Sequence, residues 1–120
     1  MNIDEIIDAH LAAYGEPDDA RRAGMVKELW AADGSLIDPP FDGTGHEAIA
    51  GLGAILQQHY AGHTFRRTTG VDAHHGVARY GWELVAPDGT AILHGTDVAD
   101  FGEDGSLRRV VGFFGPPATI

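Results

Sequence analysis

The amino-acid sequence predicts one α+β domain in which three helices precede a mostly antiparallel sheet. Apolar residues recur at three- and four-residue steps as far as about residue 60, which is the period of amphipathic helices. From Thr64 onward the period is two, and turn sequences interrupt it at 73–76, 87–89 and 103–105. Such short connections favour antiparallel neighbours, so we expect the helices to cover one face of a continuous meander.

The first half of the chain carries the helix signals. A first helix is indicated by the apolar face between Ile3 and Tyr14, and Gly15-Glu16-Pro17 ends it. Asp18 or Asp19 can cap a second helix with an inner face that runs to Trp30. Thr44-Gly45-His46-Glu47 has the pattern of a capping box, which predicts a third helix extending to about Tyr60.

The remaining segments are predicted to be strands. After the turn at Asp33-Gly34, a short strand is expected from Ser35 to Asp38. Four longer strands are expected near 64–73, 76–86, 90–101 and 106–114.

Length and composition exclude several classes of protein. A chain of 120 residues forms one domain, 1–120, and can bury a single core with one ligand-sized pocket. Its formal net charge of −10 repels nucleic acids and anionic membranes. There is no cysteine, no basic leader and no long apolar run, so a cytoplasmic protein without thiol chemistry is expected.

Asp97 is the strongest candidate for a functional residue. It lies in the middle of an apolar strand, where aspartate is rare, and an unpaired buried carboxylate is costly. Gly95 and Ala99 share its face and leave room beside it. Asp38 ends another short apolar run before Pro39, and two acids on strands could face one pocket.

Each acid also has a structural interpretation. Asp38 could simply accept hydrogen bonds from turn amides. Asp97 could be paired with Arg79, which lies opposite it if 87–89 forms a three-residue hairpin loop. The apolar alternation through Tyr80 and Trp82 argues for the other face, and a β-bulge would reconcile the two registers.

Several sequence pieces resemble one known family when they are taken in order. They are Leu29-Trp30-Ala31-Ala32-Asp33-Gly34, Ile37-Asp38-Pro39, Gly45-His46-Glu47-Ala48-Ile49, Tyr80-Gly81-Trp82-Glu83-Leu84, Pro87-Asp88-Gly89, Gly95-Thr96-Asp97, Asp104-Gly105 and Val111-Gly112-Phe113-Phe114. Together they resemble the nuclear transport factor 2-like superfamily, and its SnoaL-like polyketide cyclase branch most closely. The resemblance implies a cystatin-like cone, in which a strongly curved sheet wraps helices around a pocket and commonly pairs into dimers.

The resemblance also implies candidate roles. In the related ketosteroid isomerase one Asp is the base, while a protonated Asp and a Tyr hold the oxyanion. These positions match Asp38 and Asp97, and the Tyr position matches His10. SnoaL-like cyclases likewise use a pocket Asp to move a proton next to a carbonyl, which leaves open which acid is the base. Epoxide hydrolase chemistry is not expected, because Gly81 and Gly112 replace its two acids.

We therefore expect a cofactor-independent isomerase or cyclase with Asp38, Asp97 and His10 as catalytic residues and no metal site. The expected pocket walls are Tyr14, Trp30, Leu56, Tyr60, Trp82, Phe101, Val110, Gly112 and Phe114. The competing hypothesis is a non-catalytic dimeric module that binds a small apolar ligand or another protein. A homodimer is expected in both cases, because Ile92 and Val98 lie on the outer sheet face.

Overall fold

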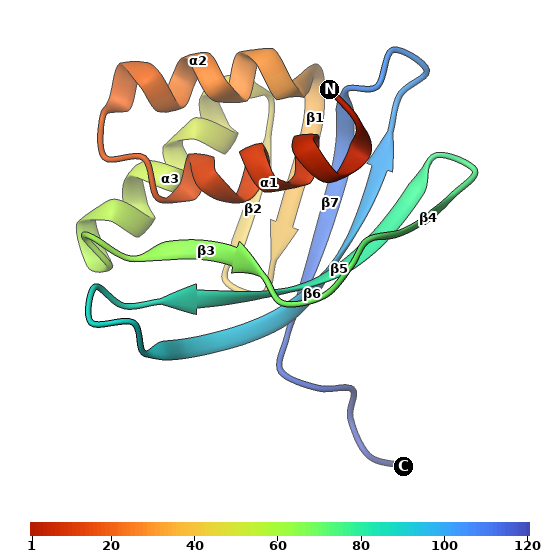
Figure 1. Cartoon of the computed structure of the whole chain (residues 1–120). Coiled ribbons are helices and arrows are strands. Elements are labelled where there is room, and N and C mark those ends of the chain that lie inside the picture. Colours follow the sequence, from red (N-terminus) through yellow and green to blue (C-terminus); the bar gives the residue numbers. More distant parts are fainter.

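Three helices lie on the concave side of a strongly bent seven-stranded sheet (Figure 1). This computed structural model describes residues 1–120. The elements are α1 (Ile3–Tyr14), α2 (Asp19–Leu29), β1 (Trp30–Asp38), β2 (Phe41–Thr44), α3 (His46–His59), β3 (Thr64–Arg67), β4 (Asp72–His74), β5 (Val77–Val85), β6 (Ala91–Phe101) and β7 (Leu107–Phe114). The predicted α+β class is confirmed.

The first two helices begin and end where their local signals predict. Asn2 caps α1 and forms a capping box with Glu5, and the helix ends at Gly15. Asp18, one of the two predicted caps of α2, accepts a hydrogen bond of 2.8 Å from the amide of Arg21. Local sequence therefore determines both helices.

The capping box predicted for α3 is wrong. Thr44 pairs with Ser35 as the last residue of β2, so its backbone is extended and its hydroxyl does not cap the helix. Gly45 is the cap residue instead, with a φ of 90° that favours glycine. The helix starts one residue later than the pattern suggested.

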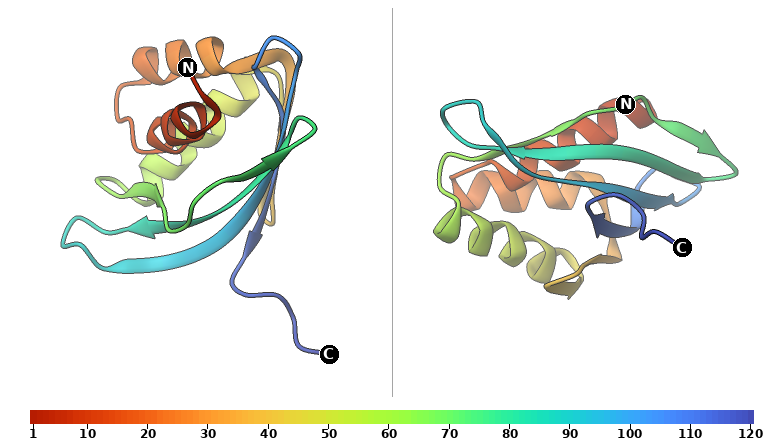
Figure 2. Two further views of the ribbon diagram at one scale, coloured as in Figure 1. Left: turned by 45° about the vertical axis from the view of Figure 1, so that its right-hand side comes forward. Right: turned by 90° about the horizontal axis from the view of Figure 1, so that it is seen from below.

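The sheet has the strand order β2-β1-β7-β6-β5-β3, with β4 also pairing with β5. All pairs are antiparallel except β1 with β7, which is parallel. As a result β1, β7, β6 and β5 lie side by side, and their concave faces look towards the helices (Figure 2).

Two strand predictions need correction. β1 begins at Trp30 rather than Ser35, and Gly34 lies inside it, where a Cβ would stand only 2.6 Å from the Trp30 ring. The strand predicted at 64–73 is broken into β3 and β4, and β2 was not predicted. At the break the hydroxyl of Thr69 accepts the Gly81 amide at 2.8 Å, so a side chain replaces the backbone partner.

The register between β5 and β6 decides the environment of Asp97. Tyr80 pairs with Asp97, and an irregularity between Leu84 and Val85 gives the register that the apolar alternation favoured. Arg79 pairs with Val98 and forms an exposed ion pair with Asp72, with 3.0 Å between Nε and Oδ2. The alternative in which Arg79 neutralises Asp97 is wrong.

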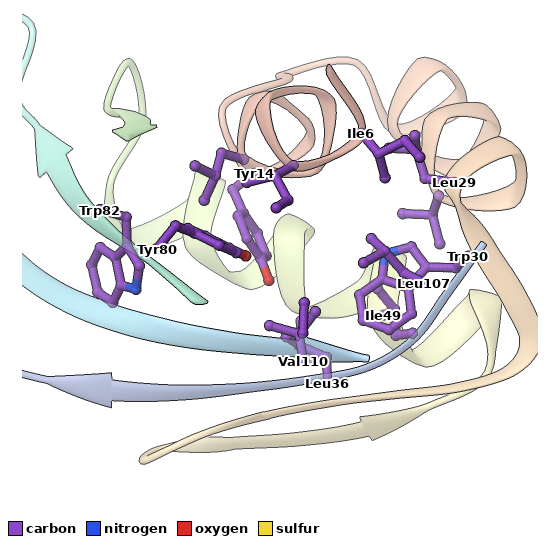
Figure 3. Packing of buried hydrophobic residues seen from close by; sticks show 14 of the residues in the cluster. Ile6, Tyr14, Leu29, Trp30, Leu36, Ile49, Tyr80, Trp82, Leu107 and Val110 are labelled. Atoms are coloured by element: carbon purple, nitrogen blue, oxygen red, sulfur yellow. The ribbon is translucent and has the colours of Figure 1, made fainter. Parts of the chain in front are cut away.

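The core lies between the helices and the half of the sheet around β1 and β7 (Figure 3). Its most deeply buried large side chains come from both layers, and they are Tyr80, Ile7, Leu11, Leu36, Leu107, His10 and Val110. None of the helices is both long and apolar enough to cross a lipid bilayer.

Candidate functional site

A cavity of about 460 Å³ opens between α1, α3 and the concave sheet face. Its size is within the usual range of small-ligand sites. Ten of the 14 lining residues are hydrophobic, and the full set is Leu11, Tyr14, Asp38, Pro40, Phe41, Leu56, His59, Tyr60, Phe65, Trp82, Leu84, Leu93, Asp97 and Phe114. Both predicted acids therefore face one apolar cavity.

Four adjacent strands place a row of residues across this cavity. Asp97 of β6 pairs with Tyr80 on one side and with Gly112 of β7 on the other. Ile37 pairs with Val111, which puts Asp38 beside Gly112 on the far side. The order across the sheet is Asp38, Gly112, Asp97, Tyr80, and we call these residues the acid row.

The two carboxyl groups lean over Gly112 from opposite sides. A Cβ at this position would collide with Oδ1 of Asp38 and would stand 2.9 Å from Oδ1 of Asp97. The carboxyl groups of Asp38 and Asp97 therefore occupy the space that a side chain at position 112 would fill.

Asp97 is held in place by two hydrogen bonds from β5. The hydroxyl of Tyr80 donates to Oδ2 at 2.9 Å, and Nε1 of Trp82 donates to Oδ1 at 2.8 Å. The residue is only 4% exposed. Burial first, and then the charge of Asp38, raise the pKa of Asp97 to about 7, although the two hydrogen bonds act in the opposite direction.

Asp38 is half-buried, and no group of the protein donates a hydrogen bond to its carboxylate. The interpretation of Asp38 as a turn acceptor therefore does not hold. Burial raises its pKa to about 6. An acid that is free of partners and aimed into a cavity can exchange a proton with a ligand.

Tyr14 extends from α1 towards the sheet, and its ring ends in the same region as that of Tyr80 (Figure 3). Burial, and then the charges of Asp38 and Asp97, raise the pKa of Tyr14 well above its ordinary value. Its hydroxyl therefore stays protonated, and it can donate a hydrogen bond either to Nε2 of His10, which is 3.5 Å away, or to a ligand in the cavity.

His10 does not line the cavity, although the sequence pointed to it as an oxyanion donor. It is buried behind Tyr14, with ring centroids 5.0 Å from Tyr14 and 5.5 Å from Trp30. Burial lowers the pKa of His10 to about 4, so the ring is neutral. Tyr14 lies one helical turn further on the same face, with its hydroxyl 3.5 Å from Nε2 of His10, and it lines the cavity that holds the acids. The i,i+4 spacing was the available signal for this position.

Five of the predicted wall residues line the cavity, namely Tyr14, Leu56, Tyr60, Trp82 and Phe114. Trp30 and Val110 belong to the core instead, Phe101 packs against the core at the end of β6, and Gly112 lies beneath the carboxyl groups. The lining residues not predicted are Leu11, Pro40, Phe41, His59, Phe65, Leu84 and Leu93. Phe41 was missed because β2 was missed.

Four aromatic rings form a continuous wall, which we call the aromatic belt. Ring centroids are 5.1 Å apart for Tyr14 and Phe65, 5.5 Å for Phe65 and Trp82, and 5.8 Å for Trp82 and Phe114. The rings meet at steep angles, as aromatic pairs prefer. No lysine or arginine lines the cavity, and no three potential metal ligands lie close enough to hold an ion.

Comparison with known proteins gives structural matches only. No family model matches the sequence, and no curated protein matches it either. A solved structure of a candidate isomerase of the SnoaL-like family from Agrobacterium tumefaciens strain C58 is 33% identical, with a TM-score of 0.88 over 93% of this chain and 96% of that chain.

More distant structures share the fold. A protein with a ketosteroid isomerase-like fold from Catenulispora acidiphila, solved with trimethylamine, is 16% identical over 91% of this chain and 84% of that chain, with a TM-score of 0.74. A candidate polyketide cyclase from Sinorhizobium meliloti is 14% identical over 91% and 94% of the two chains, with a TM-score of 0.70.

Proposed function

The chain belongs to the SnoaL-like family of the nuclear transport factor 2-like superfamily, and on this premise we propose that it is a small cofactor-independent enzyme that moves a proton next to a carbonyl group. The observation that carries the proposal is the meeting of two carboxyl groups with raised pKa values over Gly112 in an apolar cavity. Acids with pKa values near neutrality suit general acid–base work at physiological pH.

In this proposal Asp38 is the base and Asp97 is the acid. Ionised Asp38 takes a proton from the carbon next to the carbonyl, the C–H electron pair forms the enolate double bond, and the negative charge moves to oxygen. Protonated Asp97 and the Tyr14 hydroxyl donate hydrogen bonds to that oxygen. In a β,γ-unsaturated carbonyl compound the enolate is conjugated with the neighbouring double bond, so Asp38 can return the proton to the γ-carbon while the charge on oxygen re-forms the carbonyl group. This completes an isomerisation without any net loss of protons.

The charge of the cavity limits the substrate. Two acids and no lysine or arginine line it, so an anionic substrate would meet repulsion without a counterion. The apolar walls favour a hydrophobic compound. The proposed substrate is therefore an uncharged ketone or related carbonyl compound.

Hydrogen–deuterium exchange tests the chemistry even when the product has not been identified. Apolar ketones are incubated with the protein in D₂O, and deuterium uptake next to the carbonyl is followed by NMR. Asp38→Asn should slow uptake by roughly 10²- to 10⁴-fold, and Asp97→Asn by less, because an amide still donates a hydrogen bond. The exposed Asp33→Asn is the matched control.

The order of the two effects decides the roles. A larger loss in Asp97→Asn than in Asp38→Asn would make Asp97 the base. No uptake above that of a denatured sample with any ketone, while ligands still bind, would support the non-catalytic alternative.

That alternative is a binding module, and the aromatic belt is the observation that favours it. Aromatic rings beside carboxylates attract small organic cations, and one distant structural relative was solved with trimethylamine. Calorimetry can compare choline with 3,3-dimethylbutan-1-ol, an uncharged analogue of the same shape. A cation-binding role predicts that choline binds more tightly than the analogue, that it binds more tightly at pH 8 than at pH 5, and that Asp38→Asn abolishes this pH dependence. Equal affinities of the protein for the two ligands would reject the role.

A further inference from the structure

Asp38 on β1 and Asp97 on β6 are separated by the strand β7, which lies between them in the sheet. Neighbouring strands lie about 4.8 Å apart, so side chains that stand straight up from β1 and β6 would be roughly 10 Å apart and would not meet. Asp38 and Asp97 nevertheless approach the same point above β7. They can do so because Gly112 has no side chain there.

From this geometry we infer that Gly112 is a positioning residue, and that the empty space above it lets Asp38 and Asp97 hold one proton between them and act as a single acid–base pair. The inference uses the site of the proposed function, but the sharing of the proton does not depend on which reaction follows.

The hydrogen bonds around Asp97 favour sharing. Trp82 and Tyr80 approach from β5 and fix the orientation of the carboxyl group, with Oδ1 on the side of Gly112. If Oδ1 carries the proton, it can accept from Trp82 and still donate towards Asp38. Oδ2 then remains the acceptor for Tyr80.

The surroundings provide no cation that could replace the shared proton. Tyr14 on α1 and Tyr80 on β5 keep their protons, because burial raises the pKa of both phenols. His10 on α1 is neutral, since burial lowers its pKa, and His59 of α3 is at the exposed end of the cavity. Two ionised carboxylates would repel each other in these apolar surroundings, and one proton removes that repulsion.

The pair has a direct consequence for the proposed chemistry. Only the singly protonated form offers both a carboxylate base and the acidic donor that supplements Tyr14. The doubly protonated form lacks the base, and the doubly ionised form lacks the donor at Asp97 and adds a second negative charge beside the oxyanion. Activity should therefore show a bell-shaped pH profile whose two limbs belong to the pair rather than to either acid.

The test measures the titration of the Asp97 side-chain carboxyl carbon by ¹³C NMR, which needs no substrate. In the otherwise unchanged protein, Asp38→Asn should lower the pKa of Asp97 by about one unit or more, because the neighbouring charge is gone. In a Gly112→Ala background the added methyl group displaces Asp38, so the same Asp38→Asn change should no longer shift the pKa of Asp97. Gly51→Ala, which adds a methyl group in open space on α3, is the matched background and should keep the full shift.

Two results would overturn the inference. If Asp38→Asn leaves the titration of Asp97 unchanged in the parent protein, the acids do not share a proton. If the shift persists in Gly112→Ala, the glycine does not position them. Should Gly112→Ala fail to fold, combining it with Asp38→Gly removes the collision with Asp38 and leaves only the 2.9 Å approach to Oδ1 of Asp97. This double variant should be more stable than Gly112→Ala, and an equal defect in both would also refute the role of Gly112. A shared proton without deuterium uptake by any ketone would refute the proposed reaction alone.

Discussion

At the scale of single residues, Asp38 and Asp97 each contribute more to stability in acid than at neutral pH. The pKa values of about 6 and about 7 in the folded chain exceed those of an unfolded aspartate. These two residues therefore bind more protons in the folded state than in the unfolded state from about pH 4 to pH 7, and their contribution to the free energy of unfolding falls as the pH rises through this window. His10 acts in the opposite direction, because burial lowers its pKa to about 4 and its contribution rises as the pH increases from there to 6.5.

Urea unfolding of the parent protein and of Asp97→Asn at pH 5 and pH 8 isolates the contribution of Asp97, because His10 contributes equally to both proteins. Between pH 5 and pH 8 we expect the free energy of unfolding of the parent protein to fall by roughly 1 to 3 kcal/mol relative to that of Asp97→Asn. The lowered pKa values of Asp88 and Asp104 affect stability only at lower pH, so they do not obscure the comparison. An equal pH dependence of the two proteins would contradict the raised pKa of Asp97.

At the scale of elements, the strand break between β3 and β4 depends on one hydroxyl group. Thr69 accepts the Gly81 amide, while the neighbouring Thr68 offers only its backbone amide to Gly81. Thr69→Val should therefore cost about 1 kcal/mol and expose the Gly81 amide to hydrogen exchange. Thr68→Val is the control, since its hydroxyl makes no hydrogen bond, and equal effects of the two changes would disprove this role.

Elements with local signals were predictable from the sequence, and elements with tertiary signals were not. The cap at Asp18 and the stop at Gly15 lie next to the helices they control. The break at Thr69 depends instead on a contact with a strand twelve residues away, and no local pattern records it. The candidate site shows the same contrast between local and tertiary signals. Its two acids could be predicted locally, because aspartate is unusual in an apolar strand.

The rest of the site required the three-dimensional register. Tyr80 and Trp82 became hydrogen-bond donors to Asp97 only through the irregularity near Leu84. Tyr14 lines the cavity and His10 does not. Helix periodicity places both residues on the same face and does not show which side chain extends into the cavity. Residue types were therefore readable from sequence, whereas their partners were not.

At the scale of the whole molecule, the outer sheet face predicts self-association. Ile92, Val98 and Phe113 lie on this face with exposed fractions of 47%, 37% and 58%. Light scattering should give twice the 12.7 kDa mass of one chain at micromolar concentration. Phe113→Glu should shift the protein to the monomer, while Ile55→Glu on the exposed side of α3 should not, and a monomeric parent protein would disprove the prediction.

The empty position at Gly112 also has a meaning for molecular evolution. Any substitution at this position adds at least a methyl group where the carboxyl groups meet. We therefore expect alanine or serine to replace Gly112 only in lineages in which position 38 already has a shorter side chain than aspartate. The order of these changes would then be constrained, with Asp38 going first. Among relatives, a larger residue aligned with Gly112 would identify proteins that have the same fold but lack the acid pair, and that therefore have a different function.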